Sequence, residues 1–73
     1  MTHDQLRQAL RELNGERHAV FVVADVHHAA GMAALTVKHA MLIPDEEDHL
    51  VKVTDGKSIY IIDAERVAWI QIG

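Results

Sequence analysis

The sequence predicts a mainly β fold, in which one N-terminal α-helix precedes a five-stranded, strongly bent small β-barrel. The chain has 73 residues and 49% of them are hydrophobic, which suits one folded domain, residues 1–73. The first thirteen residues have helical periodicity, and the remainder consists of β-branched apolar segments separated by turn signals. An open sheet of such strands would leave apolar edges, so we expect closure into a barrel.

The helix is predicted over residues 3–13. Thr2 and Gln5 have the spacing of a capping box, and Asn14-Gly15 supplies the left-handed stop that often follows a helix. Apolar side chains recur at i, i+3, i+4 and i+7 and form one stripe, made of Leu6, Ala9, Leu10 and Leu13.

Five strands are predicted, at about residues 18–26, 33–43, 50–54, 58–62 and 67–72. Asp55-Gly56 indicates a type I′ hairpin turn, and Asp63 is expected to cap a single 3₁₀ turn before the last strand. His39 has the inward parity of the second strand, so we expect either a buried histidine or a bulge near Ala40 that turns it outward. The residues expected on the inward face of that strand are Leu35, Val37, Met41 and Ile43.

Charge and composition exclude several classes of protein. Seven Lys and Arg face eleven Asp and Glu, and four of the acids form the run Asp45-Glu46-Glu47-Asp48, interpreted as a solvated loop. The bases are scattered, which argues against binding duplex DNA. Without cysteine there is no disulfide and no thiolate zinc site. No apolar run is long enough to span a membrane or to form a signal peptide core, so the expected location is the cytoplasm.

The order of the elements and the segment SIYIIDAERVAWIQI, from Ser58 to Ile72, resemble the Sm-like (Lsm/Hfq-type) family of small SH3-like barrels. The resemblance implies a ring in which the fourth strand of one subunit pairs with the fifth strand of the next. It also implies a nucleotide pocket, but Asp63-Ala64 stands where the family has Arg-Gly, and the loop before the third strand is acidic. We therefore expect an altered ligand pocket at His49, Asp63 and Arg66, with RNA as one candidate partner.

The histidines, Asp25 and Ser58 give little indication of a metal site or a catalytic site. His27 and His28 are adjacent, so on extended backbone they point to opposite faces. His49 beside the acidic run is the best cluster for a weak divalent site, although a solvated loop is the plainer interpretation. Asp25 near the two histidines is interpreted as a turn former, and Ser58, the only serine, lies beside a hairpin. We expect no cofactor, no metal and no enzymatic activity.

The last two strands have large apolar groups on both faces, although a barrel has only one interior. Either a neighbouring subunit or the helix must cover the second set. Domains of this size often need a disulfide, a metal or oligomerisation for stability, and oligomerisation is the remaining option here. Gln71→Pro is expected to weaken such an assembly by removing one ladder hydrogen bond. The predicted subunit interface consists of Ile59, Tyr60, Ile61, Ile62, Val67, Trp69, Ile70 and Ile72.

The sequence thus predicts a non-enzymatic, self-assembling Sm-like barrel, a homo-oligomeric ring or smaller closed assembly with RNA as a candidate ligand. A protein-interaction or structural adaptor that does not bind nucleic acid is the first alternative. A small histidine-based metal-binding protein is the second alternative.

Overall fold

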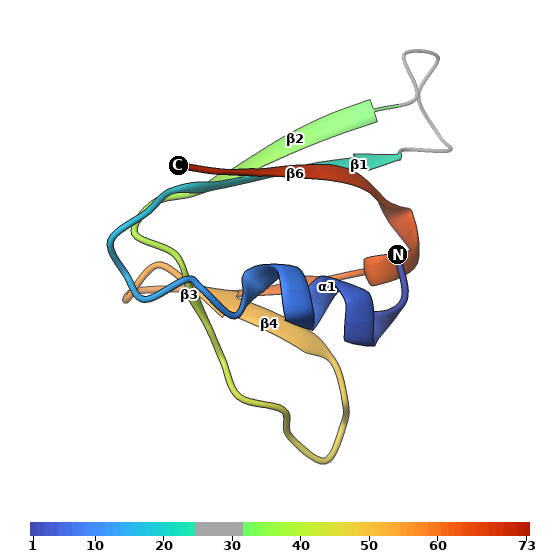
Figure 1. The fold of residues 1–73 in the computed structure, drawn as a ribbon, viewed down its shortest axis with the longest axis horizontal. Helices are drawn as coiled ribbons and strands as arrows, with labels where there is room; N and C mark the ends of the chain where they lie inside the picture. Colours follow the sequence, from blue (N-terminus) through green and yellow to red (C-terminus); the bar gives the residue numbers. More distant parts are fainter. Residues whose placement is uncertain (25–31) are drawn as a thin grey trace.

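The computed structural model describes residues 1–24 and 32–73, and within them the fold is mainly β with one N-terminal helix (Figure 1). Strand 67–72 was predicted with its observed bounds, and the other strands are shorter than predicted or divided. The end of the predicted strand 18–26 lies outside the described residues. The elements are α1 His3–Leu10, β1 Ala19–Ala24, β2 Met32–Val37, β3 Met41–Leu42, β4 Val51–Thr54, β5 Ile59–Ile62, the 3₁₀ turn η1 Ala64–Arg66, and β6 Val67–Ile72.

The described strands form two three-stranded antiparallel sheets with the orders β2-β1-β6 and β3-β4-β5. In β1, Phe21 pairs with Leu35 of β2 on one side and with Ile70 of β6 on the other. Neither sheet closes into a barrel, so the mainly β class with an N-terminal helix is confirmed and the five-stranded barrel is not.

The predicted strand 33–43 is divided into β2 and β3 by a turn at His39, which has a φ of 50°. The loop before β1 holds this turn, because the Ala40 N–H donates to the Arg17 carbonyl at 2.9 Å and the Gly15 N–H donates to the Ala40 carbonyl at 3.0 Å. The turn reverses the inward and outward parity of the residues after it. Met41 is therefore exposed, not inward as predicted, while Ala40 is buried and His39 faces solvent.

The capping box of α1 is confirmed, since the Gln5 N–H donates to Thr2 Oγ1 at 3.1 Å and the Thr2 N–H donates to Gln5 Oε1 at 3.0 Å. The helix ends at Leu10, earlier than predicted. A turn comes next, in which the Leu13 N–H donates to the Leu10 carbonyl at 3.0 Å and the Leu13 side chain remains buried. The helix packs against β3, β4 and η1.

Two predicted turns have different outcomes. The 3₁₀ turn η1 is confirmed, with Asp63 as the cap that accepts the Glu65 N–H at 3.2 Å. The type I′ turn at Asp55-Gly56 is wrong, because that turn needs two positive φ angles and Gly56 alone has one. The Asp55 carboxylate instead accepts the N–H groups of Lys57 and Ser58, at 2.8 and 2.7 Å, and closes the turn through its side chain.

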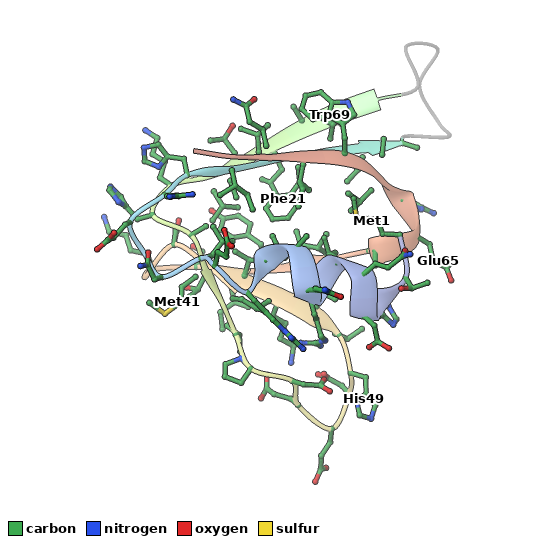
Figure 2. The ribbon with its side chains drawn as sticks, in the orientation of Figure 1. Met1, Phe21, Met41, His49, Glu65 and Trp69 are labelled. Atoms are coloured by element: carbon green, nitrogen blue, oxygen red, sulfur yellow. The ribbon has the colours of Figure 1, made fainter. Side chains whose placement is uncertain are left out.

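The core lies between the two sheets and α1, and Phe21 is its largest fully buried side chain (Figure 2). Both sheets and the helix contribute to it, which explains why alternate residues of β4 are buried. In β1 the alternation is broken by Val22, which is buried on the other face. The other large, fully buried side chains are Leu6, Leu10, Val37, Val51 and Val53.

Candidate functional site

Strands β5 and β6 each lie at the end of a sheet, and each presents large apolar side chains to solvent. Ile59 and Ile61 of β5 are 63% and 61% exposed, and Trp69 of β6 is 50% exposed. Neither strand contains a charged residue or a proline, the features that normally protect the edge of a sheet. These two strands are the most unusual feature of the described surface.

The hydrogen bonds at the ends of both strands reveal which backbone groups face the open edges. Bonded and non-bonded residue pairs alternate along an antiparallel ladder. The Gly73 N–H donates to the His18 carbonyl at 3.0 Å, so by alternation the backbone of Gln71 faces β1, and the backbones of Ile70 and Ile72 face the open edge. Gln71→Pro would therefore damage the ladder inside the molecule.

The same reasoning applies to β5. The Asp55 N–H donates to the Ser58 carbonyl at 3.4 Å, so by alternation the backbone of Tyr60 faces β4. The backbones of Ile59 and Ile61 then face the open edge, and their side chains point away from the core. Each open edge thus offers two residues with backbone donors and acceptors directed outward.

The predicted interface residues fall into three groups by burial. Ile62 and Val67 belong to the core of the single chain, and Ile59, Ile61 and Trp69 are exposed. The remaining three are partly buried against the core: Tyr60, Ile70 and Ile72. The pKa of Asp55 is lowered chiefly by the backbone N–H groups of Ser58 and Lys57, and further by the Tyr60 hydroxyl, which donates to Asp55 Oδ2 at 3.2 Å. The same hydrogen bond raises the pKa of Tyr60.

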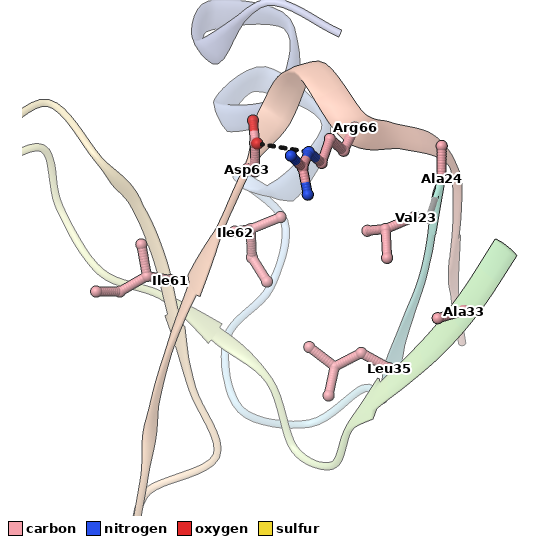
Figure 3. A pocket seen from close by; sticks show the side chains of 8 residues that line it. All are labelled: Val23, Ala24, Ala33, Leu35, Ile61, Ile62, Asp63 and Arg66. Atoms are coloured by element: carbon pink, nitrogen blue, oxygen red, sulfur yellow. Dashed lines mark ion pairs between the residues drawn. The ribbon is translucent and has the colours of Figure 1, made fainter. Parts of the chain in front are cut away.

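A pocket of about 340 Å³ opens between the end of β5, η1 and the facing ends of β1 and β2 (Figure 3). Val23, Leu35 and Ile62 point into it from three strands, whereas Ile61 points to the other side of β5. Asp63 and Arg66 lie at its rim, where the Arg66 Nε is 3.3 Å from Asp63 Oδ2. The sequence predicted that both residues belong to one ligand pocket, and both line this one.

His49, the third residue predicted for that pocket, does not line it and lies in the loop between β3 and β4 (Figure 2). Its Nδ1 is 3.3 Å from Asp45 Oδ2, and its φ is 56°. The acidic run is exposed, as expected of a solvated loop, but three of its four acids form ion pairs. Arg7 pairs with Asp45 at 3.0 Å, and Lys52 pairs with Glu46 at 2.9 Å and with Asp48 at 2.6 Å.

These ion pairs shift the pKa values of the paired groups and occupy two of the protein's bases. The Lys52 ammonium, followed by the Leu50 N–H, holds the pKa of Asp48 below its ordinary value, and the Asp48 carboxylate raises the pKa of Lys52. The side chains of Arg7 and Lys52 are only 13% and 15% exposed, so their two charges offset part of the loop's negative charge and are poorly presented to a polyanion. Nothing in the sequence pattern marks Arg7 for this role, because Asp45 is far from it along the chain.

Within residues 1–24 and 32–73, no three His, Asp or Glu side chains come together in a way that suits a metal ion. His18 and His39 form a pair, in which the His39 N–H donates to His18 Nδ1 at 3.1 Å. Asp25, His27 and His28 lie outside the described residues. In the described part of the chain, no helix has the length and apolar character needed to cross a membrane.

No protein-family model matches this chain, and no curated protein and no solved structure matches it either. The resemblance to the Sm-like family therefore depends on the order of the elements and on the segment from Ser58 to Ile72.

Proposed function

We propose that this protein is a non-enzymatic, self-assembling module of the Sm-like kind, whose copies join by pairing β5 of one copy with β6 of the next. The observation that supports this proposal most directly is the exposure of Ile59 and Ile61 on a strand edge that carries no charge. Left open, such an edge favours uncontrolled association, whereas a specific partner strand satisfies its backbone and covers its side chains.

Stereochemistry constrains how the two edges combine. In an antiparallel pair, directly opposed residues have their side chains on the same face of the sheet. Ile59 and Ile61 face the edge of β5 with outward side chains, and Ile70 and Ile72 face the edge of β6 with side chains toward the core. The outer face of β5 therefore continues into the inner face of the neighbouring β6.

One register pairs all four residues of β5 with the last four of β6, beyond the irregularity in the β1–β6 ladder. In this register Ile61 is opposite Ile70 of the next copy, and Ile59 is opposite Ile72. The exposed isoleucines are then covered by the partly buried isoleucines of the neighbour. Because the two paired surfaces differ, the contact is head-to-tail, and rotation closes it into a ring.

The proposal makes the module a scaffold that acts through its assembly and through protein contacts. RNA binding, the other function implied by the resemblance, needs cations that are available to phosphate. Arg7 and Lys52 are engaged with the acidic loop, and Arg66 is paired with Asp63. The other four bases are exposed but scattered along the chain: Arg11, Arg17, Lys38 and Lys57. Polarisation of a labelled oligouridine at two salt concentrations separates the two functions, since phosphate-driven binding weakens steeply with salt.

The test of assembly is the solution mass, measured by sedimentation velocity at micromolar concentration. Wild type is expected at a multiple of 8.2 kDa. Ile61→Lys is expected at the monomer mass with an unchanged far-UV circular dichroism spectrum, because this side chain is outside the core. Leu50→Lys is the matched control, since Leu50 is also exposed but lies outside both edges, and it should keep the wild-type mass. A wild type that sediments as an 8.2 kDa monomer overturns the proposal.

A further inference from the structure

We infer that Trp69 of one copy fills the pocket between β5, η1 and the ends of β1 and β2 in the next copy. This inference rests on the proposed assembly and adds the residue that anchors it. A single chain leaves two apolar features without a partner. The pocket is a mostly apolar space of about 340 Å³, and Trp69, the largest side chain of the protein, is half exposed.

The position of Trp69 on its own sheet suits insertion into a neighbour. It projects from the outer face of β6, on the side of the sheet opposite to Phe21 (Figure 2). Its cross-strand partner Val22 is buried although it is not part of the core between the sheets. Trp69 thus lies beside Val22 on the face of the sheet that is turned away from α1, and Trp69 is the exposed member of the pair.

The register of the proposed pairing directs Trp69 toward the pocket. When Ile61 is opposite Ile70 of the next copy, Ile62 is opposite Trp69 of that copy. Opposed side chains share a face, and the side chain of Ile62 points into the pocket (Figure 3). The pocket is lined by β5 and not by β4, so it lies toward the edge from which the neighbouring strand approaches.

The chemistry of the pocket fits an indole. Burying a tryptophan side chain removes about 150–250 Å² from water, and Val23, Leu35 and Ile62 provide an apolar surface for it. At the rim, Arg66 Nε lies 3.3 Å from Asp63 Oδ2. An arginine at the edge of such a site is well placed for a cation–π contact with the entering ring.

The experiment uses Trp69 itself as the probe, because the chain has one tryptophan. Emission maximum and acrylamide quenching are followed as the protein is diluted, with the mass measured in parallel by sedimentation. We expect the oligomer to have blue-shifted emission and weaker quenching than the monomer. An oligomer whose Trp69 is quenched as readily as the monomer overturns the inference and leaves the proposed assembly intact. Absence of any oligomer overturns both.

Two variants with matched controls sharpen the result. Trp69→Ala should weaken assembly on the order of 30-fold, the loss typical of an anchoring interface residue, and Gln71→Ala on the same face should not. Ala33→Phe places a ring in the pocket and should likewise weaken assembly, whereas Thr36→Phe, on β2 but outside the pocket, should not. Equal effects within either pair contradict the inference. A small apolar dye tests whether the pocket is filled in the oligomer. Dye binding to the wild-type oligomer that is lost in Ala33→Phe would show that the pocket is empty, and would also contradict the inference.

Discussion

Lys52 has a structural role that the sequence pattern does not predict. As an outward residue of β4 it would ordinarily be a solvated strand lysine. Instead its ammonium binds Glu46 and Asp48, while Arg7 binds Asp45 from the helix. Two bases thus hold three of the four acids in the loop. Neutralising the whole acidic run therefore removes contacts between the loop, α1 and β4.

Asp48 makes this loop sensitive to acid. The pKa of this carboxyl is lowered in the folded protein, chiefly by Lys52, so its contribution to stability is present above the unfolded pKa, ordinarily 3.8. That contribution is lost as the pH falls through the folded value. Asp48→Asn should therefore be less stable than wild type at pH 6, and the difference should shrink below about pH 4 and then vanish.

Urea denaturation between about pH 6 and pH 2 measures this difference. Glu47→Gln is the control, because the ion pairs of the loop involve the three other acids of the run. A difference between Asp48→Asn and wild type that is the same at both ends of this pH range contradicts the role of the ionised carboxylate.

At the scale of the elements, the turn at His39 decides where one long strand becomes two. The turn lets β2 pair with β1 in one sheet and β3 pair with β4 in the other, so that the two sheets face each other across Phe21. It also moves Ala40 into the core and Met41 out of it. The bonds that hold it come from Gly15 and Arg17, far from it in the sequence.

The left-handed backbone of His39 leads to a prediction about substitution. A side chain in this conformation costs about 1–2 kcal/mol, a β-branched one is disfavoured further, and glycine has no such cost. His39→Gly should therefore be at least as stable as wild type, and His39→Ile should be less stable than wild type by the further penalty of a β-branched side chain. Both variants keep the N–H that donates to His18.

Thermal and urea unfolding of the two variants provide the measurement, with Lys38→Ile as the control. Lys38 is the exposed neighbour of His39 and does not have a positive φ. If Lys38→Ile and His39→Ile lose the same stability, the backbone conformation of His39 is not the cause.

At the scale of the whole molecule, the two sheets leave β5 and β6 as edge strands that expose large apolar side chains, namely Ile59, Ile61 and Trp69. Because ladder hydrogen bonds alternate along each edge strand, only some substitutions on β5 and β6 affect the open edge. Gln71→Pro attacks the β1–β6 ladder, so a loss of mass in that variant would result from damage to the subunit itself. Ile61→Lys acts at the edge, because Ile61 is exposed and belongs to no part of the core.

The proposed register is testable by disulfide formation, since the chain has no cysteine of its own. Directly opposed, hydrogen-bonded residues of an antiparallel pair have Cα atoms about 5.5 Å apart, within the range that disulfides span. The variant Ile59→Cys with Ile72→Cys should therefore oxidise to a ladder of multiples of 8.2 kDa on a non-reducing gel.

A shift of one residue provides the control for this prediction. Ile59→Cys with Gln71→Cys places the two side chains on opposite faces of the joined sheet and should give little cross-linking. Equal ladders from the two double variants, or a ladder only from the second, would contradict the register.

Three local features of this protein are determined by the sequence alone. Thr2 and Gln5 cap the helix, Asp63 caps the 3₁₀ turn, and strand 67–72 has the predicted bounds, because each depends on neighbours in the chain. The division of strand 33–43 and the pairing of the acidic loop were decided by the tertiary structure. Their partners, such as Arg17 for Ala40 and Arg7 for Asp45, are distant in sequence, and no local periodicity encodes them. The same holds for the pocket, whose walls come from three strands and η1 that meet only when the two sheets face each other.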